Sequence, residues 1–197
     1  MREAGAMTDG TERVDRERSV LVVVDVQERL AAVMPRRDEV AATSSRLIRA
    51  AGVLGIPVVV TRQYPKGLGD TVPEVALALG ELESQPPVVD KTTFCCADEP
   101  AFPAVLDEIG REQVVLVGME THICVTQTAL ALTAAGRPVF VVADGVCSRD
   151  DRDHEVALAR LRAAGVVVAT SESVMYEALG RAGTPEFKRV LEIVKDA

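Results

Sequence analysis

The sequence predicts one α/β domain, a Rossmann-like three-layer α/β/α fold around a mostly parallel, doubly wound sheet of about six strands. Short runs rich in Val alternate with longer amphipathic segments along the whole chain. The runs are almost continuously apolar, which is typical of strands covered on both faces, and regular alternation of strand and helix favours a parallel sheet. A chain of 197 residues suits one domain and is short for two.

The elements follow from apolar periodicity and from Gly and Pro punctuation. We expect strands at residues 19–24, 56–61, 88–90, 114–118, 137–145 and 166–170. We expect helices at residues 37–53, 72–82, 99–110, 121–136, 152–164, 171 onward and 184–195. In the helix 152–164 the predicted apolar set is Val156, Leu158, Ala159 and Leu161, with His154 facing solvent. Residues 1–16 are polar and predict a flexible tail, so the domain is expected to span residues 17–197.

Composition narrows the function classes. The net charge of −8 argues against nucleic acid or an anionic membrane as the partner and favours a small-molecule substrate. No apolar run reaches the roughly 20 residues that span a bilayer, and Met1–Arg18 lacks the apolar core of a secretory signal. We therefore expect a cytoplasmic protein whose four cysteines are reduced. Of these, Cys95 and Cys96 are expected to be buried and inert, and Cys147 to be structural.

Three reactive side chains follow three different predicted strands: Asp25, Lys91 and Cys124. Parallel strands end at the same edge of a sheet, so these side chains can meet there. Cys124 lies near a helix start, where the helix dipole is expected to lower its pKa below the free value of about 8.5. Each residue also has a plainer interpretation, because an Asp there often caps a turn, a single Lys is usually solvated and a free Cys is usually a small buried apolar residue.

Three motifs together resemble the isochorismatase-like cysteine hydrolases. They are Val24-Asp25-Val26-Gln27, Lys91-Thr92-Thr93-Phe94 and Gly118-Met119-Glu120-Thr121-His122-Ile123-Cys124-Val125. The resemblance covers about residues 17–195. It implies a catalytic triad of Asp25, Lys91 and Cys124, with Cys124 as nucleophile. It also implies a cis peptide bond at Met119–Glu120 and an oxyanion hole formed by the backbone N–H groups of Glu120 and Cys124.

The loop at residues 63–69 is closest to the isochorismatase domain-containing protein subgroup. Nicotinamidases of the wider family bind a metal through an Asp and histidines in this loop. This chain has only His122 and His154 and carries Arg62, Gln63 and Tyr64 in the loop. We therefore expect no metal and no other cofactor. The side chains expected to line a substrate pocket are Gln27, Tyr64, Phe94, Thr121 and His122.

These features predict a metal-independent amidohydrolase that cleaves a C–N bond of a small amide or carbamoyl substrate through a thioester acyl-enzyme. Two alternatives stay open. One is an isochorismatase-type vinyl ether hydrolase driven by Asp25, and the other is a catalytically idle binding or assembly module. The family resemblance also implies a homo-oligomer.

Overall fold

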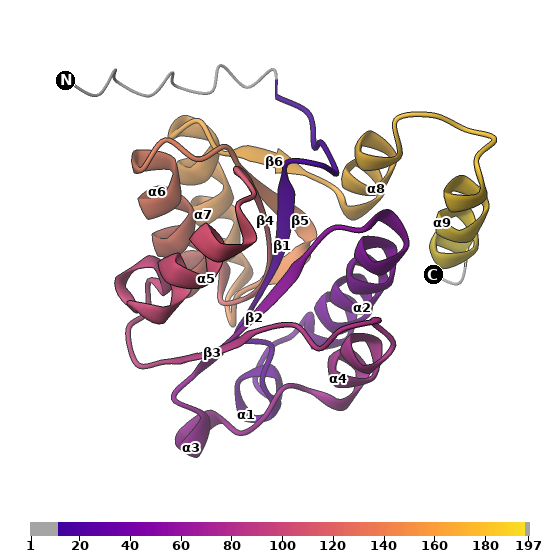
Figure 1. Ribbon diagram of the computed structural model, residues 1–197. Helices are drawn as coiled ribbons and strands as arrows, with labels where there is room; N and C mark the ends of the chain where they lie inside the picture. Colours follow the sequence, from indigo (N-terminus) through magenta and orange to yellow (C-terminus); the bar gives the residue numbers. More distant parts are fainter. Residues whose placement is uncertain (1–11, 196–197) are drawn as a thin grey trace.

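The computed structural model describes residues 12–195 and contains one six-stranded sheet with helices on both faces (Figure 1). The strands are β1 (Ser19–Val24), β2 (Val58–Gln63), β3 (Val88–Lys91), β4 (Gln113–Met119), β5 (Val139–Cys147) and β6 (Val167–Ala169). Their order is β3-β2-β1-β4-β5-β6, and every neighbouring pair is parallel. The predicted fold class is confirmed.

The chain starts in the middle of the sheet and winds outward twice. From β1 it proceeds through β2 to β3 at one edge, and then returns to β4 on the other side of β1. The strand order therefore reverses between β1 and β4, and such switch points are where open α/β sheets bind ligands. Asp25 follows β1 and the Cys124 segment follows β4, so the topology brings these two groups to the switch point.

Helices cover both faces of the sheet. They are α1 (Glu28–Ala31), α2 (Arg37–Leu54), α3 (Pro65–Leu68), α4 (Pro73–Gly80), α5 (Ala101–Ile109), α6 (Thr126–Ala134), α7 (Asp151–Ala163), α8 (Ser171–Leu179) and α9 (Pro185–Lys195). Two shorter helical turns, η1 (Cys96–Asp98) and η2 (Thr121–Val125), precede α5 and α6. In Figure 1 the helices α5, α6 and α7 lie on one face, and α2, α4, α8 and α9 lie on the other.

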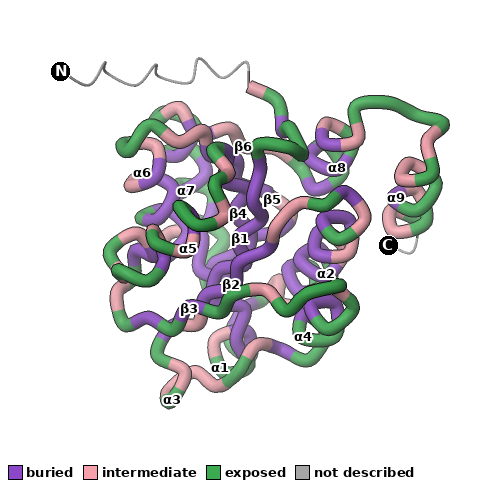
Figure 2. The backbone as a smooth tube through the Cα atoms, in the orientation of Figure 1, coloured by how far each residue is buried: buried purple, intermediate pink, exposed green. Residues whose placement is uncertain are grey.

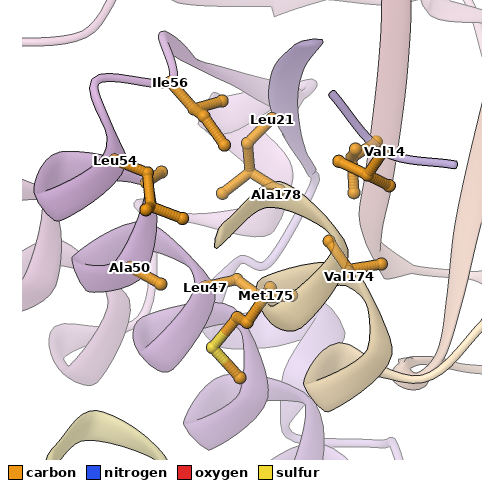
Figure 3. Close-up of a pocket in the computed structure, with 11 residues that line it drawn as sticks. Val14, Leu21, Leu47, Ala50, Leu54, Ile56, Val174, Met175 and Ala178 are labelled. Carbon is orange, nitrogen blue, oxygen red and sulfur yellow. The ribbon is translucent and has the colours of Figure 1, made fainter. Parts of the chain in front are cut away.

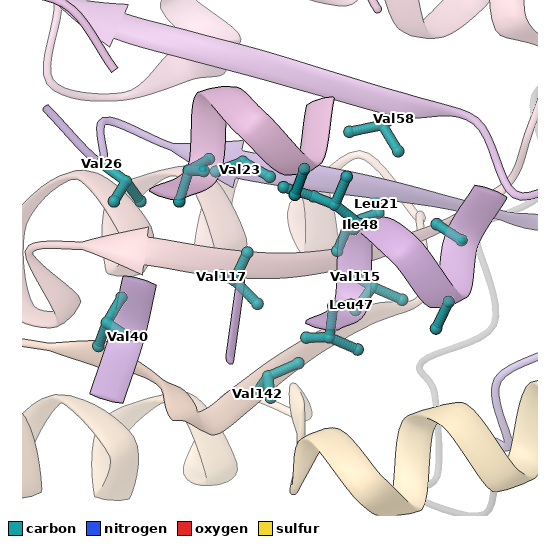
Figure 4. Packing of buried hydrophobic residues seen from close by; sticks show 14 of the residues in the cluster. Leu21, Val23, Val26, Val40, Leu47, Ile48, Val58, Val115, Val117 and Val142 are labelled. Carbon is teal, nitrogen blue, oxygen red and sulfur yellow. The ribbon is translucent and has the colours of Figure 1, made fainter. Parts of the chain in front are cut away.

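Alternating strand side chains build two cores. Leu21 and Val23 of β1 pack toward α2 (Figure 4), whereas Val20 and Val22 pack toward the face of α5, α6 and α7. Both sets are shielded from solvent, so the central strands are buried along their whole length (Figure 2). This explains why β1 reads as a continuous apolar run rather than an alternating one.

A small apolar cavity of about 20 Å³ remains beside α2 and α8 (Figure 3). It is lined by aliphatic side chains that include Leu21, Leu47 and Met175, and neither Asp25, Lys91 nor Cys124 lines it. The cavity therefore belongs to the core rather than to the cluster of reactive residues.

The start of the packed region differs from the prediction. Residues 1–11 of the expected tail lie outside the described residues. Val14, however, is only 2% exposed, and its N–H donates to Glu177 Oε2 at 2.8 Å. Asp15 N–H likewise donates to Gln113 Oε1 at 2.8 Å. Residues 12–16 are therefore part of the packed domain, because the Val14 side chain and several long-range hydrogen bonds anchor them.

The helix α7 confirms Leu158 and Leu161 of the predicted apolar set as buried, whereas Val156 and Ala159 are exposed. Its buried residues are His154, Ala157, Leu158 and Leu161, whereas Val156 is exposed. The set 154, 157, 158 and 161 has the i, i+3, i+4, i+7 spacing of a helix stripe. His154 is therefore buried rather than solvent-exposed, because it occupies the first position of that stripe.

Within residues 12–195, no helix combines the length and the apolar character needed to cross a membrane.

Candidate active site

Asp25 follows β1 at a point where the backbone turns sharply. Its φ is +52°, a left-handed conformation that Asp adopts more readily than most residues. The side chain is fully buried, with Oδ1 accepting from Thr61 Oγ1 at 2.7 Å and Oδ2 accepting from Lys91 Nζ at 2.7 Å. A buried carboxylate needs such partners to offset its lost hydration, and here one of them is a cation.

Lys91 ends β3 and is as deeply buried as Asp25. Besides Asp25, its Nζ donates to Gln63 Oε1 at 2.6 Å and to the carbonyl oxygen of Thr93 at 3.2 Å. Burial is the largest single influence and lowers the pKa of Lys91, but the Asp25 carboxylate together with Cys96 and Cys124 raises it by more, so the net shift is upward. Lys91 is therefore a charged lysine inside the protein, held in place by oxygen atoms from several segments.

A close backbone contact between β1 and β4 positions the segment that carries Cys124. Gly118 pairs with Val24 across the two strands and has a φ of +121°. A Cβ atom on Gly118 would lie 1.9 Å from the carbonyl oxygen of Val24, so only glycine fits. The peptide bond Met119–Glu120, one residue further on, is cis, as the family resemblance implied. The chain then enters the turn Thr121–Val125, which we call the Cys124 turn.

Asp25 and Lys91 both act on the pKa of the Cys124 thiol. Burial raises the pKa of the Cys124 thiol, the Asp25 carboxylate raises it further through its charge and a hydrogen-bonding interaction, and Lys91 lowers it. The net shift is upward, so the predicted lowering by a helix start is wrong. The sulfur lies within the Cys124 turn, buried beside the Asp25 carboxylate. Burial and the charge of the carboxylate both raise the pKa, and together they outweigh the effect of the helix dipole. The resting side chain is a neutral thiol next to a proton acceptor.

Three neighbours of this cluster were not foreseen from sequence. Thr61 donates to Asp25, and Gln63 accepts from Lys91 while donating to the Thr92 carbonyl at 2.9 Å. Thr61 and Gln63 are two residues apart in β2 and so point to the same face, a signal that the sequence does contain. Cys96 Sγ lies 3.9 Å from Thr61 Oγ1, and burial raises the pKa of its thiol to about 11. The expectation that Cys95 and Cys96 are buried is confirmed.

Three of the expected pocket residues differ in their exposure to solvent. Tyr64 and Phe94 are 54% and 56% exposed, and both follow strands that carry cluster residues. Gln27 is buried, with its amide donating to the carbonyl oxygens of Gln63 and Gly69 and accepting from the Gln63 N–H. Gln27 thus has no free donor for a substrate; it ties the loop after β2 to β1.

The two remaining pocket candidates make contacts to the segment after β5. Thr121 Oγ1 lies 2.9 Å from His154 Nδ1, on a fully buried contact. His122 is partly exposed, and its Nδ1 lies 2.8 Å from Ser148 Oγ. Both contacts therefore hold the Cys124 turn against the segment after β5. Among residues 12–195 no three His, Cys, Asp or Glu side chains are grouped closely enough to hold a metal ion.

Comparison with known proteins identifies the family of the chain. The Isochorismatase domain family matches residues 19–173. The chain belongs to the isochorismatase domain family. An isochorismatase domain-containing protein 1 from Salmo salar is 40% identical over 177 residues, which is 90% of this chain and 61% of the relative. The chain thus spans less than two thirds of that relative's length.

Solved structures of the isochorismatase fold superpose closely. A structure described as the MAR1 ribonuclease from Caenorhabditis elegans is 38% identical, with a TM-score of 0.87 and 93% of each chain covered. The YcaC gene product from Escherichia coli, described as an octameric hydrolase of unknown specificity, has a TM-score of 0.83 at 22% identity, covering 93% of this chain and 92% of that one. The second likeness shows the fold alone.

Proposed function

We propose that this chain is a cysteine hydrolase that cleaves the C–N bond of a small amide or carbamoyl substrate, with Asp25, Lys91 and Cys124 as its catalytic residues. One observation carries the proposal. A thiol, a carboxylate and a lysine from three distant segments interact in the protein interior, with the lysine and the carboxylate 2.7 Å apart. A charged pair buried in this way costs several kcal/mol in desolvation, and a task in catalysis accounts for it.

The proposed reaction begins with a neutral thiol. As Cys124 Sγ forms a bond to the substrate carbonyl carbon, its proton passes to Asp25, and Lys91 stays protonated. The oxygen of the tetrahedral intermediate becomes negative, and the backbone N–H groups of Glu120 and Cys124 are the proposed donors to it. Collapse breaks the C–N bond while Asp25 gives the proton to the departing nitrogen.

A thioester on Cys124 then remains. Water attacks its carbonyl carbon and gives a proton to Asp25, the C–S bond breaks, and the proton returns to the sulfur. Asp25 thus moves one proton in each half-reaction and ends unchanged. No step requires an oxidant, a reductant or a second substrate other than water.

The substrate is proposed to be small and not a nucleic acid. The name of the C. elegans neighbour refers to RNA, but a chain with a net charge of −8 repels a polyphosphate backbone. Assembly into a homo-oligomer, which the family resemblance implies, is proposed as well. Light scattering during size-exclusion chromatography measures this state.

The test is a panel of small primary amides, carbamates and ureas assayed for ammonia release with wild type, Cys124→Ala and Cys95→Ala. Cys95 is a matched control, since it is buried and its sulfur contacts the Gln127 carbonyl at 3.6 Å. We expect turnover to disappear in Cys124→Ala and to persist in Cys95→Ala. Cleavage of a vinyl ether by wild type and Cys124→Ala, but not by Asp25→Asn, would support the vinyl ether type of reaction instead. Wild-type inactivity on every amide would favour a binding module.

A further inference from the structure

The Cys124 turn is fastened to α7 and to the segment between β5 and α7. Glu120, just before the turn, accepts from the backbone N–H of Arg149 at 3.0 Å and from its Nε at 3.1 Å. Inside the turn, Thr121 Oγ1 contacts His154 Nδ1 at 2.9 Å. Of these fastenings, the His154 contact is deeply buried and is made by a titratable ring.

The second ring nitrogen of His154 fixes the proton on the first. His154 Nε2 lies 3.1 Å from Arg36 Nη1. A guanidinium can only donate, so Nε2 accepts and carries no proton. In a neutral imidazole the proton then sits on Nδ1, and His154 donates to Thr121 Oγ1. One tautomer alone satisfies both contacts.

Arg36 itself is held in position. Its Nε donates to Glu39 Oε2 at 2.8 Å and its Nη2 donates to Glu39 Oε1 at 3.2 Å. This forked pairing orients the guanidinium plane and leaves Nη1 for His154. A chain of contacts therefore runs from α2 through α7 to the Cys124 turn, in the order Glu39, Arg36, His154, Thr121.

The surroundings of His154 favour the neutral ring. The residue is 3% exposed. Burial lowers its pKa, and Arg36 lowers it further, while Glu155 and Asp151 on α7 and Glu39 on α2 act in the opposite direction. The net shift is downward. A second proton on the ring would set an N–H at Nε2 against the Arg36 N–H, which breaks the chain of contacts.

We propose that His154, held between Arg36 and Thr121, is a positioning residue that fixes the Cys124 turn and so aims the Cys124 sulfur at Asp25 and at the substrate carbonyl. The inference rests on the proposed function, in which Cys124 is the nucleophile. His154 acts through Thr121 and does not touch the reacting atoms.

Two substitutions separate the two contacts of the ring. The amide nitrogen of Asn occupies roughly the place of Nδ1, so His154→Asn keeps a donor to Thr121 and loses Arg36. The amide of Gln reaches roughly the place of Nε2, so His154→Gln keeps an acceptor for Arg36 and loses the donor to Thr121. Thr121→Val removes the same hydrogen bond from the other side with little change in shape. It serves as a second variant if His154→Gln fails to fold.

Activity is then measured from pH 5 to 9, and labelling is measured from neutral to strongly alkaline pH. With an amide that wild type hydrolyses, we expect kcat to fall about 10²-fold in His154→Gln and Thr121→Val, the scale of a small misplacement of reacting groups, with KM little changed. His154→Asn restores kcat to within a few-fold of wild type. Wild-type activity also decreases at acidic pH, once the pH falls below the lowered pKa of the ring and the ring gains its second proton, and His154→Asn lacks this ring-dependent decrease.

Labelling of Cys124 by iodoacetamide gives a readout without substrate. When the turn is released, the sulfur leaves the Asp25 carboxylate, so the pH midpoint of labelling moves down toward that of an ordinary thiol in His154→Gln and Thr121→Val. It stays at the wild-type position in His154→Asn. Wild-type midpoints and kcat values in all three variants would overturn the positioning role. Turnover that persists in Cys124→Ala would instead overturn the proposed function. The labelling midpoints would then still show whether the His154–Thr121 contact positions the Cys124 turn.

Discussion

Lys91 Nζ lies 2.7 Å from Asp25 Oδ2, and both side chains are wholly shielded from solvent. The pair links the carboxyl ends of β3 and β1, which are separated by β2 in the sheet. Because the lysine balances the carboxylate, a proton can move from the Cys124 thiol to Asp25 without creating net charge in the interior. This relationship between Lys91 and Asp25 determines the consequences of most substitutions at the site.

Asp25→Asn removes the proton acceptor while keeping the shape of the side chain. We expect amide hydrolysis to fall by about 10²–10⁴-fold, the usual contribution of a positioned general base. The same change removes a negative charge from beside the thiol, so Cys124 becomes more acidic while the enzyme becomes slower. Parallel assays of ammonia release and thiol titration measure the two effects. A rate of hydrolysis that rises in Asp25→Asn together with the ionised fraction of the Cys124 thiol would contradict a base role for Asp25.

Lys91→Met leaves the Asp25 carboxylate buried without its cation. Breaking such a pair costs about 3–5 kcal/mol of unfolding free energy, measured by urea denaturation at neutral pH. Lys66→Met is the control, because Lys66 is exposed and such changes usually stay within about 0.5 kcal/mol. The double variant Asp25→Asn/Lys91→Met is expected to be more stable than Lys91→Met. Equal stability of Lys91→Met and Lys66→Met would show that the pair is not desolvated.

The raised pKa of Lys91 has a further effect at alkaline pH. A folded-state pKa above the unfolded value means that its stabilisation is complete below about pH 10.4 and is lost as pH rises through the folded value. The difference in unfolding free energy between wild type and Lys91→Met therefore shrinks at high pH. A difference that stays constant up to the folded-state pKa and beyond would contradict this linkage.

Gly118→Ala tests the close approach of β1 and β4. The added Cβ would overlap the Val24 carbonyl oxygen at 1.9 Å, at a φ of +121°, so we expect a loss of several kcal/mol or failure to fold. Gly80→Ala is the control, since nothing lies within 4 Å of its Cβ and alanine favours a helix. Thermal unfolding of both variants decides the matter. A Gly118→Ala protein as stable as Gly80→Ala would mean that the two strands do not approach so closely.

His154 predicts a pH dependence of stability at mild acidity. Its pKa is lowered in the folded state, so the unfolded chain binds more protons as pH falls below about 6.5, and folding stability decreases. His154→Asn is expected to show a shallower decline than wild type between pH 7 and pH 5, measured by denaturation at several pH values. Identical slopes would place His154 in contact with solvent.

The alternation of strands and helices, and the expectation that Asp25, Lys91 and Cys124 lie at one edge of the sheet, follow from local patterns. Apolar runs such as Val20–Val24 identify buried strands, and parallel strands bring the residues that follow them to one edge. The family resemblance carried by the motifs then led us to expect the cis peptide bond at Met119–Glu120. These features need no knowledge of which side chains touch across the sheet.

The contacts that tune the site depend on pairs far apart in sequence. Gln27 looked like a pocket residue by its position after β1, yet its amide is engaged with Gln63 and Gly69. His154 looked exposed because its immediate neighbours are charged, although its helix stripe places it inside. The pKa of Cys124 was predicted with the wrong sign because the helix dipole is a local effect, whereas burial and the Asp25 carboxylate come from the tertiary fold.

The most direct measurement compares wild type with Asp25→Asn in peptide-mapped labelling of all four cysteines by iodoacetamide across a pH series. In wild type we expect the Cys124 labelling midpoint to lie above that of an ordinary thiol, because burial and the Asp25 carboxylate raise its pKa. In Asp25→Asn the midpoint is expected to fall, while that of Cys147, whose shift comes first from burial, stays in place. A Cys124 midpoint that does not respond to Asp25→Asn would contradict the proposed transfer of a proton from Cys124 to Asp25.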